Sequence, residues 1–148
     1  MAGTVNVRLS ATLLDMLERT AWQAEPHEAC ALLLGEVGEA GICVTQAVVT
    51  DNVTEGNPET SFEIEPSMHI LLQKAARAGG PQIVGVWHSH PNGVARPSAA
   101  DKSQSVEPGW VWLISGVREG VADHAAFRAA QGDPHQLDDC VLTVMSGE

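Results

Sequence analysis

The sequence VWHSHPNGVARPSAAD, residues 86–101, holds the pattern from which the fold and chemistry of this chain can be inferred. The apolar run that leads into it, residues 83–87, predicts a strand buried on both faces. Proline and glycine punctuate residues 91–97 and predict a loop. Ser98, followed three positions later by an acidic residue, is typical of a helix start. A strand, a loop and a short helix are therefore expected to meet at this stretch.

Two histidines lie at the end of the predicted strand. His88 and His90 are two positions apart, so on a strand their side chains leave the same face about 7 Å apart. An isolated His-x-His is more often an ordinary surface or hydrogen-bonded pair, and Ser98 with Asp101 alone is more often a helix cap. The whole combination is different, because its chance occurrence is on the order of one in ten million per starting position.

Asp101 supplies a third candidate ligand from the start of the predicted helix. Zinc in catalytic sites takes histidine nitrogen and carboxylate oxygen ligands and keeps a fourth position for water. Bound zinc lowers the pKa of that water to about 7. A separate base is still required, because a histidine that ligates the metal cannot also accept a proton there.

This stretch resembles the signature of the JAMM (MPN-plus, JAB1/Mov34) zinc metalloproteases, in the order His88-Ser89-His90-Pro91-x6-Ser98-x-x-Asp101. An upstream segment resembles the family pattern Pro-x-Glu-x-Cys-Gly-x-Leu-x-Gly and reads Pro26-His27-Glu28-Ala29-Cys30-Ala31-Leu32-Leu33-Leu34-Gly35. Ala31 departs from the usual glycine and touches none of the mapped catalytic positions. The similarity is to the compact prokaryotic form and covers most of residues 5–130.

The resemblance implies a cytidine-deaminase-like α/β/α fold with a mixed central β-sheet flanked by helices. It also implies a Zn²⁺ ion held by His88, His90 and Asp101. Glu28 is then the general base that takes a proton from the zinc water. Ser98 is expected to donate a hydrogen bond to the developing oxyanion.

The same resemblance implies a peptidase that acts on a ubiquitin-like partner. We expect hydrolysis after the C-terminal Gly-Gly of a sulfur-carrier protein of β-grasp fold, with release of an attached amino acid or short extension. An alternative is a deubiquitinase-like isopeptidase that removes a bacterial ubiquitin-like modifier from target lysines. A third is a non-catalytic MPN scaffold, although such relatives have lost ligands that are kept here. A deaminase would require a Pro-Cys-x-x-Cys motif, which the sequence lacks.

Beyond the motifs, periodicity predicts alternating strands and helices. Ser10 is a plausible cap for an amphipathic helix. The predicted helices are residues 11–24, a second from Pro66 to the glycines at 79–80, and a short one after Ser98; the predicted strands are residues 5–8, 29–35, 42–50, 62–65, 83–87, 110–115, 124–130 and 140–145. This order favours a mixed sheet with helices against it. No linker or repeat interrupts the pattern, so residues 1–148 are expected to form one domain.

Composition excludes several classes of function. The net charge is −11 at pH 7 with only 8 Lys and Arg, which disfavours nucleic acid and anionic membranes as partners. No run approaches the roughly 18 apolar residues of a membrane span. Three cysteines without a C-x-x-C motif argue against a disulfide framework or a cysteine zinc ribbon. We expect a cytoplasmic protein without a signal peptide.

Several other residues have two plausible roles. His27 adjoins Glu28 and is either an outer contact of the site or a solvated loop residue. Arg96 lies between the ligands and could meet a substrate carboxylate or solvent alone. The loop 51–61 and the strand near Phe62 could accept an extended substrate tail by strand addition. The remaining candidates are predicted to be core or ordinary structural positions: Cys30, His69, Trp87, Trp110, Trp112, His124 and His135.

Overall fold

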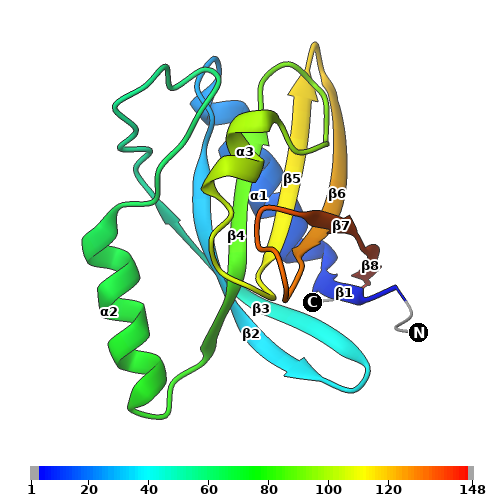
Figure 1. Cartoon of the computed structure of the whole chain (residues 1–148). Coiled ribbons are helices and arrows are strands. Elements are labelled where there is room, and N and C mark those ends of the chain that lie inside the picture. Colours follow the sequence, from blue (N-terminus) through cyan, green and yellow to red (C-terminus); the bar gives the residue numbers. More distant parts are fainter. Residues whose placement is uncertain (1–3, 147–148) are drawn as a thin grey trace.

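A computed structural model describes residues 4–146 and contains eleven regular elements (Figure 1). In chain order they are β1 Asn6–Ser10, α1 Ala11–Ala24, β2 Cys30–Gly38, β3 Gly41–Thr50, α2 Pro66–Arg77, β4 Gln82–His90, α3 Ala99–Gln104, β5 Val111–Arg118, β6 Val121–Ala129, β7 Leu137–Asp139 and β8 Val141–Met145. Within this part of the chain, no helix has the length and apolar character needed to cross a membrane.

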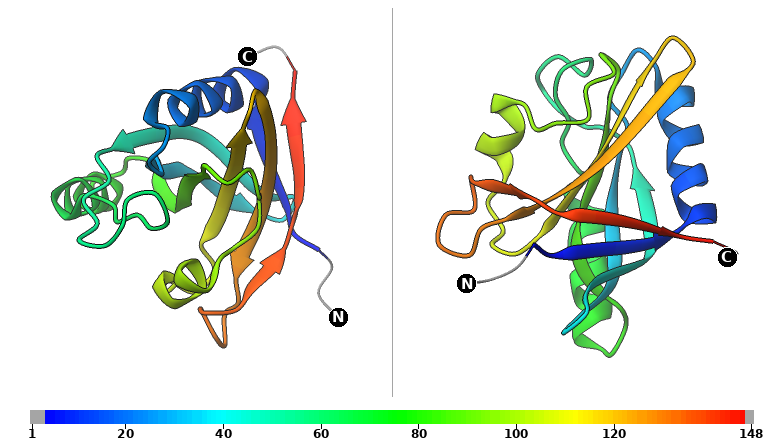
Figure 2. Two further views of the ribbon diagram at one scale, coloured as in Figure 1. Left: turned by 90° about the horizontal axis from the view of Figure 1, so that it is seen from above. Right: turned by 90° about the vertical axis from the view of Figure 1, so that its right-hand side faces the viewer.

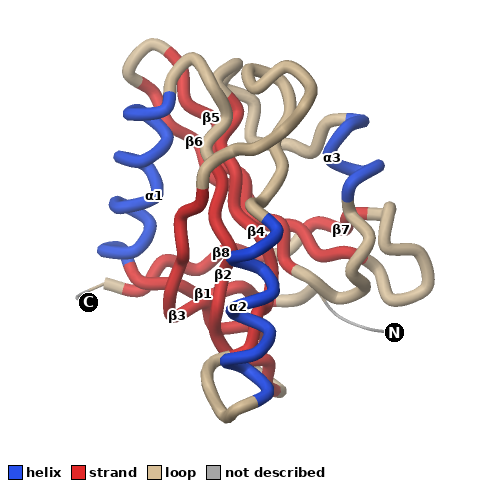
Figure 3. Tube along the Cα trace, turned by 90° about the vertical axis from the view of Figure 1, so that its left-hand side faces the viewer, coloured by secondary structure: helices blue, strands red, loops and turns tan. Residues whose placement is uncertain are grey.

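All eight strands belong to one mixed sheet in the order β7-β6-β5-β4-β2-β3-β1-β8. β4 and β5 are parallel, whereas β2 runs antiparallel to both β3 and β4. Helix α1 covers one side of the sheet, and α2 and α3 lie on the other (Figures 2 and 3). The predicted mixed α/β architecture, with helices flanking a central sheet, is therefore confirmed.

The sheet curls so strongly that its two ends come together. β7 pairs with β6 at one end of the strand order, and β8 pairs with β1 at the other. In the chain, only Cys140 separates β7 from β8. β8 lies parallel to β1, from the pair Asn6↔Val141 to the pair Ser10↔Met145. The last strand of the chain thus completes the sheet beside the first.

The alternation of side chains along the central strands places the histidines on one face. Trp87 packs with residues of α1 in one apolar cluster. Leu32 and Val86 pack in a second cluster on the opposite face, beneath α2. Successive side chains of a strand point to opposite faces, so His88 and His90 share the face of Val86. Trp87, which was predicted to be a core or ordinary structural residue, is buried in the core and faces away from both histidines.

Local signals predicted α1 correctly, and tertiary contacts overrode two other predictions. The Ser10 side chain accepts a hydrogen bond from the Leu13 N–H and caps α1, as expected. Residues 62–65 were expected to form a strand, but the structure has only an isolated bridge between Asn52 and Ile64. Within this segment the Glu63 N–H donates to the Asn52 side chain, and so it is not available to a strand ladder. Trp110 was expected to begin a strand, but it precedes β5 and is only half-buried.

The cysteines follow the composition-based prediction. Within the described residues Cys30, Cys43 and Cys140 are all free. Cys30 is buried in the second apolar cluster, which agrees with a small hydrophobic role.

The β7 strand was not predicted, since its residues Leu-Asp-Asp carry no alternating apolar pattern.

Gly85 allows β4 and β5 to approach closely three residues before His88. A Cβ added at Gly85 would lie 2.0 Å from the Val111 carbonyl oxygen. Gly85→Ala is expected to lower the free energy of unfolding by about 2 kcal/mol, because the backbones must separate. Denaturant titration measures this change. Gly38→Ala is the control, since its added methyl meets nothing within 4 Å; equal midpoints for the two variants would contradict the packing argument.

Candidate metal centre

Three segments bring four polar side chains to one end of the sheet. His88 and His90 end β4, and Asp101 lies in the first turn of α3. Glu28 precedes β2, whose antiparallel register pairs Cys30 with His88. Residues before Cys30 therefore lie beside the end of β4 that carries His90. These four of the five predicted site side chains are buried here, with at most 5% exposure, and the fifth, Ser98, is half-buried.

The three nominated ligands converge on one point. The Nε2 atoms of His88 and His90 are 2.9 Å apart. Asp101 Oδ1 lies 3.1 Å from His88 Nε2, and its Oδ2 lies 3.0 Å from His90 Nε2. Ligands of a tetrahedral zinc ion are separated by roughly 3.3 Å, given metal–ligand distances near 2.0–2.2 Å. The spacing of these atoms is close to that of a metal coordination sphere.

Hydrogen bonding explains why a cation fits among these atoms. His90 Nδ1 is 2.7 Å from the Val94 carbonyl oxygen, which can only accept, so this nitrogen carries a hydrogen. In neutral His90 the Nε2 lone pair then faces the Asp101 carboxylate and His88 Nε2. Lone pairs and a carboxylate crowded into a buried space repel one another unless a positive charge lies between them. A divalent metal bound among these atoms would supply that charge.

The surroundings shift the pKa of each of the three nominated ligands. Burial opposes ionisation of Asp101, but hydrogen bonds with both histidines outweigh it and hold the pKa well below the usual range. Burial lowers the pKa of His88, which keeps its ring neutral and its lone pair available. Burial also acts to lower the pKa of His90, but the hydrogen bond and charge of Asp101 outweigh it and raise that pKa.

Glu28 differs from the other carboxylate in the site. Burial raises its pKa to about 8, the nearby His90 partly offsets the rise, and Asp101 adds to it. Glu28 Oε1 is buried and has no hydrogen-bond partner among the described residues. Ligand-type atoms of Glu28, His88 and His90 lie within 4.8 Å of one another. The side chain is thus close to the histidines and has an oxygen available to accept a proton.

Ser98 caps α3 and orients Asp101. Its Oγ accepts a hydrogen bond from the Asp101 N–H at 3.1 Å, while the Ser98 N–H donates to Asp101 Oδ2 at 2.9 Å. This reciprocal capping box fixes the carboxylate that faces both histidines. The hydroxyl hydrogen of Ser98 remains available to donate to another acceptor.

Two aromatic residues that were not predicted as site residues form a wall of the centre. Phe62 stacks on His88 with ring centroids 4.4 Å apart. Trp112 meets the edge of the same imidazole at 5.6 Å. Trp112 was assigned to the core by strand alternation, and Phe62 lies in a segment that the periodicity described wrongly. Only the tertiary structure brings both rings to His88.

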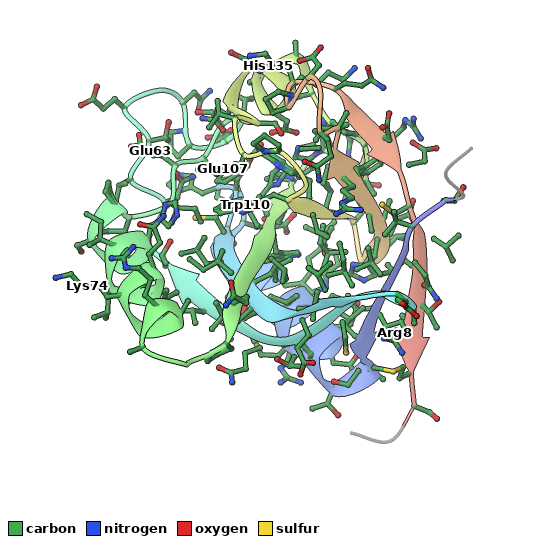
Figure 4. The ribbon with its side chains drawn as sticks, turned by 60° about the horizontal axis from the view of Figure 1, so that its bottom comes forward. Arg8, Glu63, Lys74, Glu107, Trp110 and His135 are labelled. Carbon is green, nitrogen blue, oxygen red and sulfur yellow. The ribbon has the colours of Figure 1, made fainter. Side chains whose placement is uncertain are left out.

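A groove of about 340 Å³ continues from this wall, between α2 and α3. Figure 4 labels Glu63, Glu107 and Trp110 at this groove. Its apolar lining includes the floor residue Val86, and the two glutamates make one part of it acidic. The lining residues are Phe62, Glu63, Ile64, His69, Val86, Gln104, Val106, Glu107, Trp110 and Trp112.

The remaining candidates lie outside the centre. His27 is exposed and lines a separate hollow that also reaches Glu28. Arg96 lies over the Phe127 ring and 4.0 Å from Asp139, so it points along the sheet. The His124 ring is hydrogen-bonded to the buried Ser115 hydroxyl. The same hydroxyl oxygen accepts a hydrogen bond from the indole N–H of Trp87.

Comparisons with known proteins give one consistent result. The model of the prokaryotic homologs of the JAB domain matches residues 10–130. A desampylase of Haloferax volcanii is 34% identical over 89 residues, which are 60% of this chain and 62% of that protein. The chain thus matches less than two thirds of that relative's length.

Solved structures resemble the whole fold. DSY2949 of Desulfitobacterium hafniense has a TM-score of 0.80 at 25% identity, covering 95% of this chain and 94% of that one. A protein of Salinibacter ruber has a TM-score of 0.65 at 29% identity, with 91% and 90% covered. AF2198 of Archaeoglobus fulgidus, a JAB1/MPN domain protein, has a TM-score of 0.58 at 18% identity, with 92% and 98% covered.

The raised pKa of Glu28 predicts how the metal-free protein responds to pH. Its folded-state pKa of about 8 exceeds the ordinary glutamate value of 4.5, so the buried carboxyl lowers the free energy of unfolding as pH rises between these values, by roughly 1 kcal/mol per pH unit. Glu28→Gln should therefore be more stable than the wild type at pH 8, and nearly equal at pH 4.5. Urea unfolding in chelator across this range measures the difference. The control is the exposed Glu36→Gln, and parallel curves for Glu28→Gln and wild type would refute the assignment.

Proposed function

The chain belongs to the family of prokaryotic homologs of the JAB domain, and we propose that it is a zinc-dependent peptidase acting on ubiquitin-like proteins. Its substrate is a β-grasp protein whose C-terminal Gly-Gly carries an amino acid or short extension. One observation carries this proposal. The Nε2 atoms of His88 and His90 lie 2.9 Å apart, and each lies within 3.1 Å of one carboxylate oxygen of Asp101. The buried Glu28 lies beside them.

We assign the metal to His88, His90 and Asp101 rather than to Glu28. Both oxygens of Asp101 face the Nε2 atoms, and its depressed pKa keeps it anionic, as a ligand must be. Glu28 is close to the histidines as well, but its raised pKa suits a group that exchanges a proton near neutral pH. Zinc bound there would lower the pKa of a water and polarise the scissile carbonyl.

The residues of the chain then perform proton transfer and charge stabilisation. Glu28 accepts a proton from the attacking water through the unpaired Oε1. The oxygen of that water bonds to the carbonyl carbon, and the hydroxyl of Ser98 donates to the carbonyl oxygen as it gains charge. Glu28 returns the proton to the leaving nitrogen as the C–N bond breaks. The products are a free Gly-Gly carboxylate and an amine.

The groove supports binding of an extended tail next to the scissile bond. It begins at Phe62 and Trp112, which contact His88, and its floor is apolar. The sequence raised strand addition at the loop 51–61 and the strand near Phe62, but backbone groups of Phe62 and Glu63 are already bonded within the chain. The Phe62 carbonyl accepts from Gln104 at 2.8 Å, and the Glu63 N–H donates to Asn52. Side-chain contacts therefore hold the tail in our proposal, with an apolar residue on the floor.

A second candidate is an isopeptidase that removes a ubiquitin-like modifier from lysines of target proteins. The 34% identity to a desampylase favours it. The site chemistry is the same for both, because the leaving group is an amine in each case. A non-catalytic scaffold is disfavoured, since His88, His90 and Asp101 are all present and converge.

The proposed activity predicts hydrolysis that depends on both zinc and Glu28. Purified protein is incubated with a panel of Gly-Gly-terminated ubiquitin-like proteins, each bearing a C-terminal extension or a lysine-linked target. Intact-mass analysis should show loss of the attached group directly after Gly-Gly. Chelator should abolish it, and Glu28→Gln should reduce the rate at least 100-fold, as expected for a lost general base, while keeping zinc.

Glu36→Gln, on the exposed part of β2, should behave as wild type in the same assay. Cleavage by Glu28→Gln at the wild-type rate would disprove the role of Glu28. A zinc-loaded wild type that cleaves no member of the panel would count against this substrate class. A purified protein with negligible zinc would favour the scaffold.

The groove predicts a separate effect on substrate binding. Trp110→Ala is expected to raise KM about tenfold for a tailed substrate, because an aromatic contact is lost, with kcat little changed. A short Gly-Gly-lysine substrate that does not reach the groove should show no difference. Steady-state kinetics on both substrates measures this, with Ile70→Ala, an exposed apolar position on α2, as control. Equal KM values for Trp110→Ala and Ile70→Ala would remove the groove from the binding site.

A further inference from the structure

Asn52 is hydrogen-bonded by every polar atom of its side chain. Its Nδ2 donates to the carbonyl oxygens of Glu28 at 3.1 Å and Ser61 at 3.0 Å. Its Oδ1 accepts from the N–H groups of Thr54 at 3.1 Å and Glu63 at 3.0 Å. Two amide hydrogens and two lone pairs are thus all used. A flipped amide would place its oxygen against two carbonyls, so the geometry permits one orientation.

These contacts join the candidate base to a loop that is distant in sequence. The Glu28 N–H donates to the Pro58 carbonyl oxygen at 2.7 Å, and its own carbonyl accepts from Asn52. Both backbone groups of Glu28 are therefore bound by the loop between β3 and α2. Figure 1 shows this loop at the same end of the sheet as the loop that follows β4. Where the Glu28 backbone lies depends on the conformation of that loop.

The other side of Asn52 reaches the substrate groove. Glu63, whose N–H Asn52 holds, lines the groove next to Phe62. The Val53 N–H donates back to the Glu63 carbonyl at 3.1 Å. The hydroxyls of Thr54 and Ser61 are 3.1 Å apart and close the loop behind them. A tail lying against the groove contacts the same short segment whose backbone Asn52 fixes.

We propose that Asn52 is a positioning residue that couples the segment 61–63, which contains the groove residues Phe62 and Glu63, to the placement of Glu28. This inference rests on the proposed function of Glu28 as the base. Asn52 acts through the backbone of Glu28 and does not touch the reacting atoms. A shift of about 1 Å in a catalytic group can cost 100-fold in rate, so this link has a measurable effect.

The decisive variant is Asn52→Asp. An aspartate keeps the oxygen that accepts from Thr54 and Glu63, but it replaces the donor with a negative oxygen facing two carbonyls. The matched control is Asn57→Asp in the same loop. Asn57 is exposed and its side chain accepts only from the Glu59 N–H, so this variant adds the same charge and keeps its bond.

Amide hydrogen exchange, zinc content and steady-state kinetics are measured on the zinc-loaded full chain of each variant. Asn52→Asp should speed exchange of the Glu28 N–H and lower kcat at least tenfold per zinc-bound molecule. The loss in kcat should occur with short and tailed substrates alike, whereas KM for the short substrate stays within about twofold. Asn57→Asp should match wild type in all three. Asn52→Ala, which removes the donor without adding charge, replaces Asn52→Asp if the latter does not fold.

Three outcomes overturn the proposal. One is an exchange rate of the Glu28 N–H in Asn52→Asp equal to that of Asn57→Asp. Another is a loss of activity that is fully explained by loss of zinc or of folded protein, which is what a purely structural asparagine predicts. The third is an effect on KM alone. An inactive wild type would contradict the proposed function. Hydrogen exchange does not depend on turnover, so the exchange rate of the Glu28 N–H would still test the link between Asn52 and Glu28.

Discussion

The antiparallel ladder between β2 and β4 is the constraint on which the centre depends. It pairs Cys30 with His88, and beyond the last pair Ser89 exchanges two hydrogen bonds with Ala29. The Ser89 Oγ accepts from the Ala29 N–H at 2.8 Å, and the Ser89 N–H donates to the Ala29 carbonyl at 3.0 Å. Ser89, which lies between the candidate ligands His88 and His90, therefore holds Ala29, the residue next to the candidate base Glu28. A slip of one residue would move Glu28 to the opposite face of the sheet.

Residues of the centre that lie close together in the sequence were easier to predict than the one that lies far from the others. His88, His90 and Asp101 lie within one strand, loop and helix start, so local periodicity and capping were enough to nominate them together. Glu28 lies 60 residues upstream of His88, and only the family resemblance connected it to them. Its position beside the histidines is set by strand pairing, which has no local signature.

The features that were missed share a different cause. Phe62 and Trp110 carry the groove, yet nothing in their local sequence separates a groove residue from a core residue. The strand expected at residues 62–65 did not form, and the Glu63 N–H there is bonded to the Asn52 amide instead. A side chain that replaces a ladder is a tertiary event, and periodicity cannot register it. Conversely α1, whose cap and apolar stripe are local, agreed with its predicted bounds of 11–24.

The pairing of β8 with β1 has a consequence for how the chain reaches its native state. Asn6 and Thr143 are hydrogen-bonded across 137 positions, so the outer edge of β1 finds its partner only after the elements from α1 to β7 have been synthesised. Contacts of such large separation slow folding, because the entropy of closing the loop must be lost before the contact forms. During translation β1 exposes an unpaired edge of the kind that other chains can pair with. β8 therefore acts as the closing element that removes this edge, and it is synthesised after the other ten elements described here.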